Sequence, residues 1–315
     1  MEKQQIAVID LGTNTFHLLI VSIDEHQHFH LLHRERKAVM IGRGGINLGL
    51  IKEEAQLRAL AALDQFKEVI DQYQVEHVVA TATSAFRNAH NGQELADRIY
   101  KATGIFIDII SGDTEADYIF HGVKAAMRLQ DEKALIMDIG GGSVEFIICN
   151  ADCVLWKYSF EIGAQRLLDR FQIEDPISQE NIHDLLQYFD EELLSLTTAV
   201  SKYKPDTLIG ASGTFDTLSD IYVIRETISV DPDASELPLS YEHYIGIHQE
   251  LNQKNHEQRL KIPGMVDMRA DMIVVASWLI HFVLEKYHIR QIRVSAYALK
   301  EGLLQCATKQ LIANQ

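Results

Sequence analysis

Two stretches of this chain, which begin 128 positions apart, combine residue types that can bind a phosphate group. Each is an apolar strand that ends in Asp-x-Gly, followed by two more small residues, a Thr or Ser and a second apolar strand. They run from Ile9 to His17 and from Met137 to Glu145. Backbone N–H groups beside a hydroxyl suit phosphate oxygens, and the carboxylate suits a metal ion or a water. Two such turns in matching contexts predict a duplicated phosphate-binding fold.

A third candidate is Glu115, which follows a predicted strand at the start of a helix. Helix capping is one interpretation, because Ser111 or Asp113 can cap the helix and an acid in its first turn stabilises the helix dipole. The other interpretation is catalytic, with Glu115 projecting toward the phosphate turns as the general base for an attacking water. The residue pattern alone leaves both open.

Two arginines and a third glycine turn add candidate phosphate contacts. Arg87 follows a predicted buried strand, at the edge where parallel sheets bind ligands, and its guanidinium can grip phosphate oxygens in a bidentate manner. Alternatively, Arg87 pairs with an acid on the following helix. Arg269, at the start of an apolar helix, either forms a salt bridge there or faces phosphate. The segment Gly210–Thr214 is a small-residue turn after a strand, suited to backbone contacts with phosphate.

The bulk composition limits the class of protein. With 315 residues, 47% of them hydrophobic, the chain can form two domains of ordinary size. It has no uncharged apolar run of about 18 residues or more, so we expect no membrane span. The N-terminus leads directly into a strand without a signal-peptide layout, which predicts a cytoplasmic protein. The three cysteines are too few for a disulfide framework.

The charge excludes some partners and sets a condition for others. The net charge is −16, with 45 acidic and 29 basic residues, so the surface repels nucleic acid. If the ligand is itself a polyanion, local arginines and a divalent cation must overcome this field. No Cys–His or Ser–His–Asp arrangement and no P-loop is recognisable. The pattern indicates phosphoryl chemistry carried out by a metal, a water and a carboxylate.

The order of elements repeats once along the chain. Residues 5 to 36 predict an antiparallel meander of three strands. Alternating strands and helices follow to about residue 128, which predicts a sheet that is largely parallel behind the meander. From residue 134 the same plan begins again, after a polar boundary at 129–133. Single long helices are predicted at about 178–202 and 266–287.

Three histidines alternate along the third predicted strand and therefore share one face. His26, His28 and His30 are interpreted as a solvated face beside inward-pointing Phe29 and Leu31; the alternative is a metal site.

Taken together, these motifs resemble the exopolyphosphatase and guanosine-pentaphosphate phosphohydrolase (Ppx/GppA) family, within the actin, Hsp70 and sugar-kinase superfamily. The resemblance runs through nearly the whole chain and is most specific at the second glycine turn. The matching segments are Asp10–His17, Thr83–Ala89, Ile110–Ala116 with His121–Val123, Asp138–Glu145, Glu161–Leu167, Gly210–Thr214, Arg269–Asp271 and Ala298–Leu303.

The resemblance implies an α/β fold of two actin-like (ribonuclease H-like) domains with the site in the cleft between them. Residues 1–128 with 299–315 would form the first domain, because the final helix returns to it, and residues 129–298 the second.

The resemblance also implies hydrolysis of the terminal phosphate of inorganic polyphosphate, or conversion of pppGpp to ppGpp, with Mg²⁺ as cofactor. Glu115 falls on the family's catalytic glutamate, and Asp138 and Glu145 would help to hold magnesium. The phosphates would be bound by Asp10, Gly12, Thr13, Asn14, Arg87, Gly140, Gly141, Gly142, Ser143, Ser212, Gly213, Thr214 and Arg269.

Two departures from the family pattern bear on activity. Thr114 stands where the family usually has an acid before the catalytic glutamate, which changes the charge beside the base. The chain also stops where longer members continue into a helical domain. We therefore expect a weak grip on long polyphosphate unless the protein forms a homodimer, which favours short chains or a nucleotide as substrates. The alternatives are an ATP-dependent kinase of the same superfamily, with adenine near Gly210–Thr214, and a sensor that binds polyphosphate or ppGpp without turnover.

Overall fold

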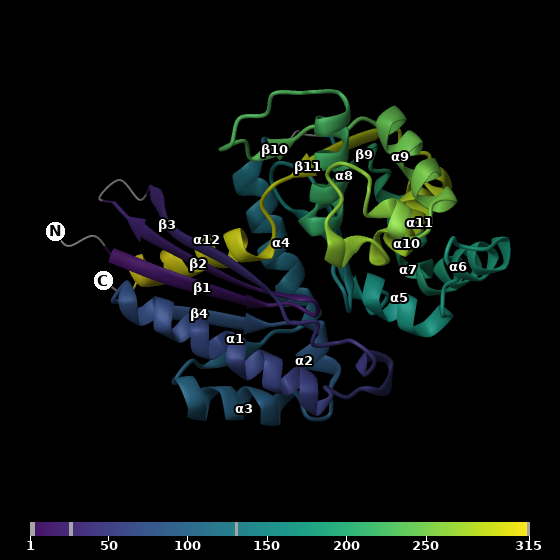
Figure 1. The fold of residues 1–315 in the computed structure, drawn as a ribbon. Coiled ribbons are helices and arrows are strands. Elements are labelled where there is room, and N and C mark those ends of the chain that lie inside the picture. The colour runs from purple at the N-terminus through teal and green to yellow at the C-terminus, as the bar shows by residue number, and fades with distance from the viewer. Residues whose placement is uncertain (1–3, 25–27, 130–131, 314–315) are drawn as a thin grey trace.

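The computed structural model describes residues 4–24, 28–129 and 132–313, which form an α/β fold on two mixed sheets (Figure 1). The first sheet has the strand order β3-β2-β1-β4-β5. Its first three strands are antiparallel to one another, and β4 and β5 run parallel to β1. The strands are β1 (Gln4–Leu11), β2 (Thr15–Ile23), β3 (Phe29–Ala38), β4 (His77–Ala82) and β5 (Ile107–Ile109).

The second sheet repeats this order as β8-β7-β6-β9-β11, with the short strand β10 added at the edge. Again the first three strands form an antiparallel meander, and β9 and β11 run parallel to the first of them. The strands are β6 (Ala134–Ile139), β7 (Val144–Cys149), β8 (Val154–Phe160), β9 (Thr207–Ala211), β10 (Glu236–Leu237) and β11 (Gln291–Ser295). The repeated topology confirms the predicted pair of actin-like units.

Helices cover both faces of the first sheet, so its central strands are almost continuously apolar. On one face, α1 (Glu53–Gln72) and α3 (Gly92–Thr103) pack against alternate residues of β1 and β2. On the opposite face, Leu303 and Leu304 of α12 (Leu299–Ala313) pack against the other residues of the same strands. The final helix therefore lies against the first sheet, where the predicted domain division puts it. The domain boundaries themselves stay a prediction.

Between the two sheets, α12 packs against α4 (Gly112–Ala126). Ala116, Ile119 and Val123 of α4 form a core cluster with residues of β6, β7 and β9. The first turns of α4 and α12 both begin close to the space between the sheets, as Figure 1 shows. The two helices thus bring their N-terminal side chains to the place where the sheets meet.

The outer face of the second sheet is covered by a larger helical layer. The side chains of this helical layer form one hydrophobic core with Met137, Val144 and Phe146 of the second sheet. The remaining helices are α2 (Ser84–Asn88), α5 (Ala164–Phe171), α6 (Gln179–Glu192), α7 (Leu194–Tyr203), α8 (Ser212–Arg225), α9 (Tyr241–Gln253), α10 (His256–Arg259) and α11 (Met272–Lys286).

Four local predictions were wrong. The single helix at 178–202 is two helices, α6 and α7, which meet at the buried Leu193. Helix α11 begins at Met272 because residues 267–269 form a separate 3₁₀ turn. The predicted turn at 210–214 is the end of β9 and the first turn of α8. Leu31, which was predicted to point inward, is 55% exposed on the edge strand β3.

The histidine strand and the membrane prediction can be compared with the described residues. His28 and His30 lie beside Asp24, and the described residues contain no group of three or more acidic, histidine or cysteine side chains arranged to hold a metal. His26 lies outside the described residues. Within the ranges that the structure describes, none of the helices is both long and apolar enough to cross a bilayer.

Candidate active site

The two Asp-x-Gly turns have the same local structure and face each other. The Gly12 N–H donates to the Thr15 carbonyl at 3.1 Å, and the Gly140 N–H donates to the Ser143 carbonyl at 3.0 Å. A Cβ added to Gly141 would lie 2.4 Å from Asn14 Nδ2, so only glycine permits this approach of one turn to the other. The glycines predicted to approach a ligand therefore also bring the two sheets together.

One cavity lies between the turns and is lined from both sheets. Fourteen of the predicted site residues line it: Asp10, Gly12, Thr13, Asn14, Glu115, Asp138, Gly140, Gly141, Gly142, Ser143, Glu145, Ser212, Gly213 and Arg269. These residues come from five separate parts of the chain, yet they share one space. The structure therefore brings most of the predicted site together, and the roles assigned to the single residues stay predictions.

Two predicted phosphate contacts do not line this cavity. Thr214 is buried in the first turn of α8. Arg87, at the end of α2, donates from Nη1 to Glu115 Oε2 at 2.9 Å and from Nη2 to Glu161 Oε1 at 3.2 Å. Nη1 also donates to the Ile110 carbonyl at 3.1 Å. The Arg87 guanidinium is thus held by acceptors of the protein itself. This agrees with the alternative that Arg87 forms an ion pair, but its acidic partners do not lie on the helix that follows it.

The central feature of the cavity is a group of buried carboxyl groups. Asp138 and Glu145 are opposite each other on β6 and β7, and Glu115 reaches the same place from the first turn of α4. Asp10 comes from the equivalent position of the first sheet. All four point toward the space between the sheets because they lie on the faces that α4 and α12 cover.

Burial makes these carboxyl groups harder to ionise. It raises the pKa of Glu115 to about 8, although the neighbouring Arg87 acts in the opposite direction. Burial raises the pKa of Asp10 to about 7, although the positive charge of Lys300 lowers it. Burial also raises the pKa of Asp138 to about 6, although a hydrogen bond from Ser212 lowers it. The pKa of Glu145 is also well above its usual range, through burial and then through the charge of Glu115.

Hydrogen bonds hold several of these groups in place. Ser212 Oγ donates to Asp138 Oδ2 at 2.7 Å, so this predicted phosphate contact orients a carboxylate in the present structure. Ser159 Oγ donates to Glu145 Oε1 at 2.6 Å. In contrast, Asp10 Oδ1 is buried and has no hydrogen-bond partner. An unpaired buried acceptor of this kind is costly unless a ligand or cation satisfies it.

The donor set fits a divalent cation. Five carboxylates line the cavity, whereas the side chains with a permanent positive charge are Arg36, Arg269 and Lys300. If all the carboxylates are ionised, two negative charges are left uncompensated. Mg²⁺ commonly binds through one or two carboxylates together with waters and substrate phosphates. It therefore does not require the group of three ligands that the described residues lack.

The cavity is also lined by polar residues to which the sequence interpretation assigned no role in the site. They are Thr15, His17, Arg36, Thr83, Asp216 and Lys300. His17 could have been found from the first hairpin, because its tight turn places His17 opposite Asp10. The other residues depend on contacts between distant parts of the chain, for which the sequence holds no local signal.

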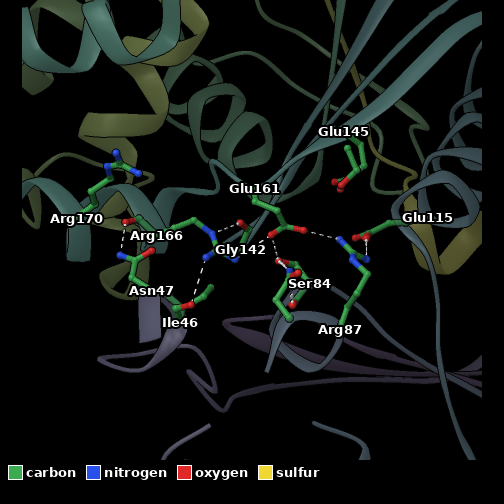
Figure 2. Close-up of polar contacts among 12 residues, drawn as sticks. Ile46, Asn47, Ser84, Arg87, Glu115, Gly142, Glu145, Glu161, Arg166 and Arg170 are labelled. Atoms are coloured by element: carbon green, nitrogen blue, oxygen red, sulfur yellow. Dashed lines mark hydrogen bonds and ion pairs between the residues drawn. The ribbon is translucent and has the colours of Figure 1, made fainter. Parts of the chain in front are cut away.

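A carboxylate bridge links the two sides of the cavity (Figure 2). Glu161, which follows β8, accepts a hydrogen bond from Ser84 Oγ at 2.6 Å and one from Arg166 Nη2 at 2.9 Å, in addition to its contact with Arg87. Arg166 also donates to the carbonyls of Gly142 and Ile46. Glu161 therefore connects the second glycine turn to α2, and through Arg87 to Glu115.

The unusual residue before Glu115 lies outside this arrangement. Thr114 Oγ1 is 2.9 Å from Ser111 Oγ, and its backbone N–H donates to the same hydroxyl, as expected at a helix N-cap. Thr114 is not among the residues that line the cavity. Its hydroxyl stabilises the start of α4, and the helix then presents Glu115 to the buried face.

Two α/β units of the same topology meet at a cavity lined by paired glycine turns and buried carboxyl groups, an arrangement suited to an enzyme that acts on phosphate groups. The model of the Ppx/GppA phosphatase family matches residues 19–310, and the chain belongs to this family of hydrolases.

Similar proteins are consistent with this assignment. The chain is 46% identical to an exopolyphosphatase from Cytophaga hutchinsonii of known structure, with a TM-score of 0.93, over 96% of this chain and 97% of that one. It is 28% identical over 318 residues to exopolyphosphatase 2 of Mycobacterium tuberculosis, over 96% and 98% of the two chains. The Aquifex aeolicus member of the Ppx/GppA family shares the fold, with a TM-score of 0.79, 24% identity and 99% of each chain covered.

Proposed function

We propose that this chain removes the terminal phosphate from inorganic polyphosphate, or from pppGpp, by attack of a water that Glu115 activates. The observation that carries the proposal is the position of Glu115. It lines the same cavity as both glycine turns, so a phosphate held between the turns lies within the space that Glu115 faces. The similarity to the Cytophaga hutchinsonii exopolyphosphatase supports the choice of a phosphoanhydride substrate.

In the proposed step, the water oxygen forms a bond to the terminal phosphorus and its proton passes to Glu115. The bond between that phosphorus and the bridging oxygen breaks, and the electron pair stays on the oxygen of the shortened chain. The products are orthophosphate and a chain with one phosphate fewer. The backbone N–H groups and hydroxyls of the two turns, including Thr13 and Ser143, are suited to hold the terminal phosphate while this occurs.

The surroundings of Glu115 suit a general base. Its raised pKa makes the ionised form a stronger base than an exposed glutamate, and a base is most effective when its pKa lies near the working pH. Arg87 contacts Glu115 Oε2 and leaves Oε1 without a protein donor in the described residues. One oxygen is therefore fixed, while the other can accept the proton of the water.

Magnesium is part of the proposal. Asp138 and Glu145 are the residues that would hold it, as predicted from the family resemblance. A bound divalent cation would neutralise phosphate oxygens and the uncompensated charge of the cavity. Asp10, with its unpaired Oδ1, is the side chain of the first sheet that is placed to approach the same ion or its waters.

The test is phosphate release in the presence of Mg²⁺ from tripolyphosphate, long polyphosphate, pppGpp and ATP, measured side by side. Release from the polyphosphates or pppGpp, without a need for an acceptor, supports the hydrolase. Formation of ADP from ATP only when an acceptor is present would indicate the kinase alternative. Binding of tripolyphosphate without turnover would indicate the sensor alternative and overturn the proposal.

Glu115→Gln tests the base itself. General-base catalysis is worth roughly 10²- to 10⁴-fold in rate, so we expect kcat to fall by at least about 100-fold while the Kd for tripolyphosphate changes little. Asp113→Asn is the matched control, because it removes an exposed carboxylate from the same first turn of α4. Equal activity of the two variants would remove Glu115 from the mechanism.

A further inference from the structure

A row of polar residues crosses the first sheet from the cavity to the edge strand. Asp10 on β1 is opposite His17 on β2, and His17 is opposite Arg36 on β3. Residues that are opposite each other on neighbouring strands project from the same face of a sheet. All three line the cavity. The row spans two strand spacings, roughly 10 Å, and ends at an exposed arginine.

The equivalent row of the second sheet has different chemistry. Asp138 on β6 is opposite Glu145 on β7, and Glu145 is opposite Ser159 on β8. Where the first sheet has histidine and arginine, the second sheet has a carboxylate and a hydroxyl. The repeated fold therefore offers one acidic wall and one wall that carries nitrogen donors.

Two further cations lie near the nitrogen-donor row. Lys300, in the first turn of α12, lines the cavity and forms an ion pair with Glu301 at 3.0 Å. The guanidinium of Arg269 lies directly over Gly213, where an added Cβ would come within 2.3 Å of Nη2. A side chain at position 213 would therefore displace the guanidinium from its present place. The guanidinium groups of Arg36 and Arg269 make no side-chain hydrogen bond or ion pair with another residue in the part of the chain that the structure describes.

The cations of the cavity act on different groups. The cation that acts most strongly on Glu115 is Arg87. Burial lowers the pKa of His17 to about 3, and the charges of Lys300, Arg36 and Arg269 act in the same direction, so His17 is a neutral hydrogen-bonding group beside these cations. Lys300 and Arg269 also act on Asp138 and Asp216, which line the same cavity.

We propose that Arg36, His17 and Arg269, with Lys300 behind them, form a subsite for the phosphates on the leaving side of the bond that is cleaved. This inference rests on the proposed function and adds the direction in which the substrate lies. The terminal phosphate is held between the glycine turns near Glu115, and the rest of the chain runs along the first sheet toward β3. Unpaired guanidinium groups bind phosphate oxygens in a bidentate manner, which explains why Arg36 and Arg269 have no protein partner.

The substrate that fits is a linear chain of phosphates with at least one phosphate beyond the cleaved bond. Because the row ends at an exposed residue of an edge strand, a longer chain can continue into solvent. The cations near the leaving group also stabilise the negative charge that develops on the departing oxygen. Orthophosphate, which has no leaving part, does not reach this subsite.

The test compares Arg36→Gln with Lys37→Gln. Both variants lose one positive charge from the same strand, but the side chain of Lys37 is on the opposite face and pairs with Glu35. A lost hydrogen bond between charged groups weakens binding by roughly tenfold or more. We expect Arg36→Gln to raise the KM and Kd for tripolyphosphate by about this factor, and to leave the Kd for orthophosphate within about twofold. Lys37→Gln should change neither, and Arg36→Lys should recover part of the loss.

The outcomes separate this inference from the proposed function. If the wild-type protein hydrolyses tripolyphosphate and Arg36→Gln behaves like Lys37→Gln, the subsite is wrong and the hydrolase stands. Equal weakening of tripolyphosphate and orthophosphate binding in Arg36→Gln would also overturn the subsite, because it would place Arg36 at the terminal phosphate. If the wild-type protein binds tripolyphosphate in an Arg36-dependent manner without turnover, the subsite stands and the hydrolase is wrong.

Discussion

Removing the Glu161 carboxylate should loosen the connection between the two sheets. Glu161 accepts hydrogen bonds from Ser84 at 2.6 Å and from Arg87 at 3.2 Å, both on the side of the first sheet, whereas its own segment belongs to the second. The substitution Glu161→Ala removes both contacts and also the hydrogen bond from Arg166 at 2.9 Å. It leaves Arg87 with Glu115 and the Ile110 carbonyl as acceptors.

The size of the effect follows from exposure. A hydrogen bond to a charged group contributes roughly 1.5 to 3 kcal/mol when it is protected from water. The Glu161 side chain is 37% exposed, so solvent screening reduces each contact to roughly 1 kcal/mol. With three such contacts, we expect Glu161→Ala to lower the free energy of unfolding by about 3 kcal/mol. For a chain of this length, that corresponds to a fall in Tm of roughly 6 °C.

Thermal unfolding of a double-mutant cycle measures the contact across the sheets directly. Glu161→Ala, Ser84→Ala and the double variant should show a coupling of roughly 1 kcal/mol, because each single change removes the same hydrogen bond. Glu132→Ala, at an exposed glutamate, is the control for loss of a surface carboxylate. Two results together would show that Glu161 does not connect the sheets. The first is that the changes in the free energy of unfolding of the two single variants add up to that of the double variant within about 0.3 kcal/mol. The second is that Glu161→Ala has the same Tm as Glu132→Ala.

Three other outcomes can be measured on the same protein. Arg87→Ala should lower kcat more than it raises KM for tripolyphosphate, because Arg87 holds Glu115 and does not line the cavity. A change in KM alone would instead support the predicted contact between Arg87 and a phosphate. His248 is buried with a pKa lowered to about 3, so the unfolded state binds its proton more readily and stability falls as the pH drops below about 6.5. Protonation of His248 in the unfolded state should lower the free energy of unfolding by about 2 kcal/mol between pH 8 and pH 5. The fall in Tm over that interval should therefore be smaller in His248→Gln than in the wild-type protein. Millimolar Mg²⁺ should raise the Tm of the wild-type protein, and Asp138→Asn should lose most of this shift; equal shifts in both would exclude Asp138 as a ligand.

The sequence predicted the parts of this site that depend on local chemistry. An Asp-x-Gly turn between two apolar strands determines a hairpin, and the hairpin determines where the carboxylate and the hydroxyl lie. Asp10, Asp138 and Ser143 are consequently found in the cavity, and the alternation of strands and helices predicted both sheets.

The sequence was less informative where distant segments decide the structure. Arg87 was considered as a phosphate contact or as a partner of the next helix, but its partners, Glu115 and Glu161, are 28 and 74 positions away. Lys300 enters the cavity only because α12 packs between the sheets. Such contacts depend on how whole elements pack, and no periodicity or turn signal encodes that packing.

The two halves of the repeated fold explain how a strongly acidic chain can receive a polyanion. Helix α4 presents Glu115 above Asp138 and Glu145, whereas α12 presents Lys300 near the row that contains Asp10. The duplicated scaffold thus supplies two similar frames that meet at one cavity, and the side chains that line it include both carboxylates and cations. Hydrolysis of a phosphoanhydride needs this difference, because a base must stand on the water side and positive charge on the side of the leaving oxygen. Two identical acidic halves would repel the substrate, and two basic halves would lack the base.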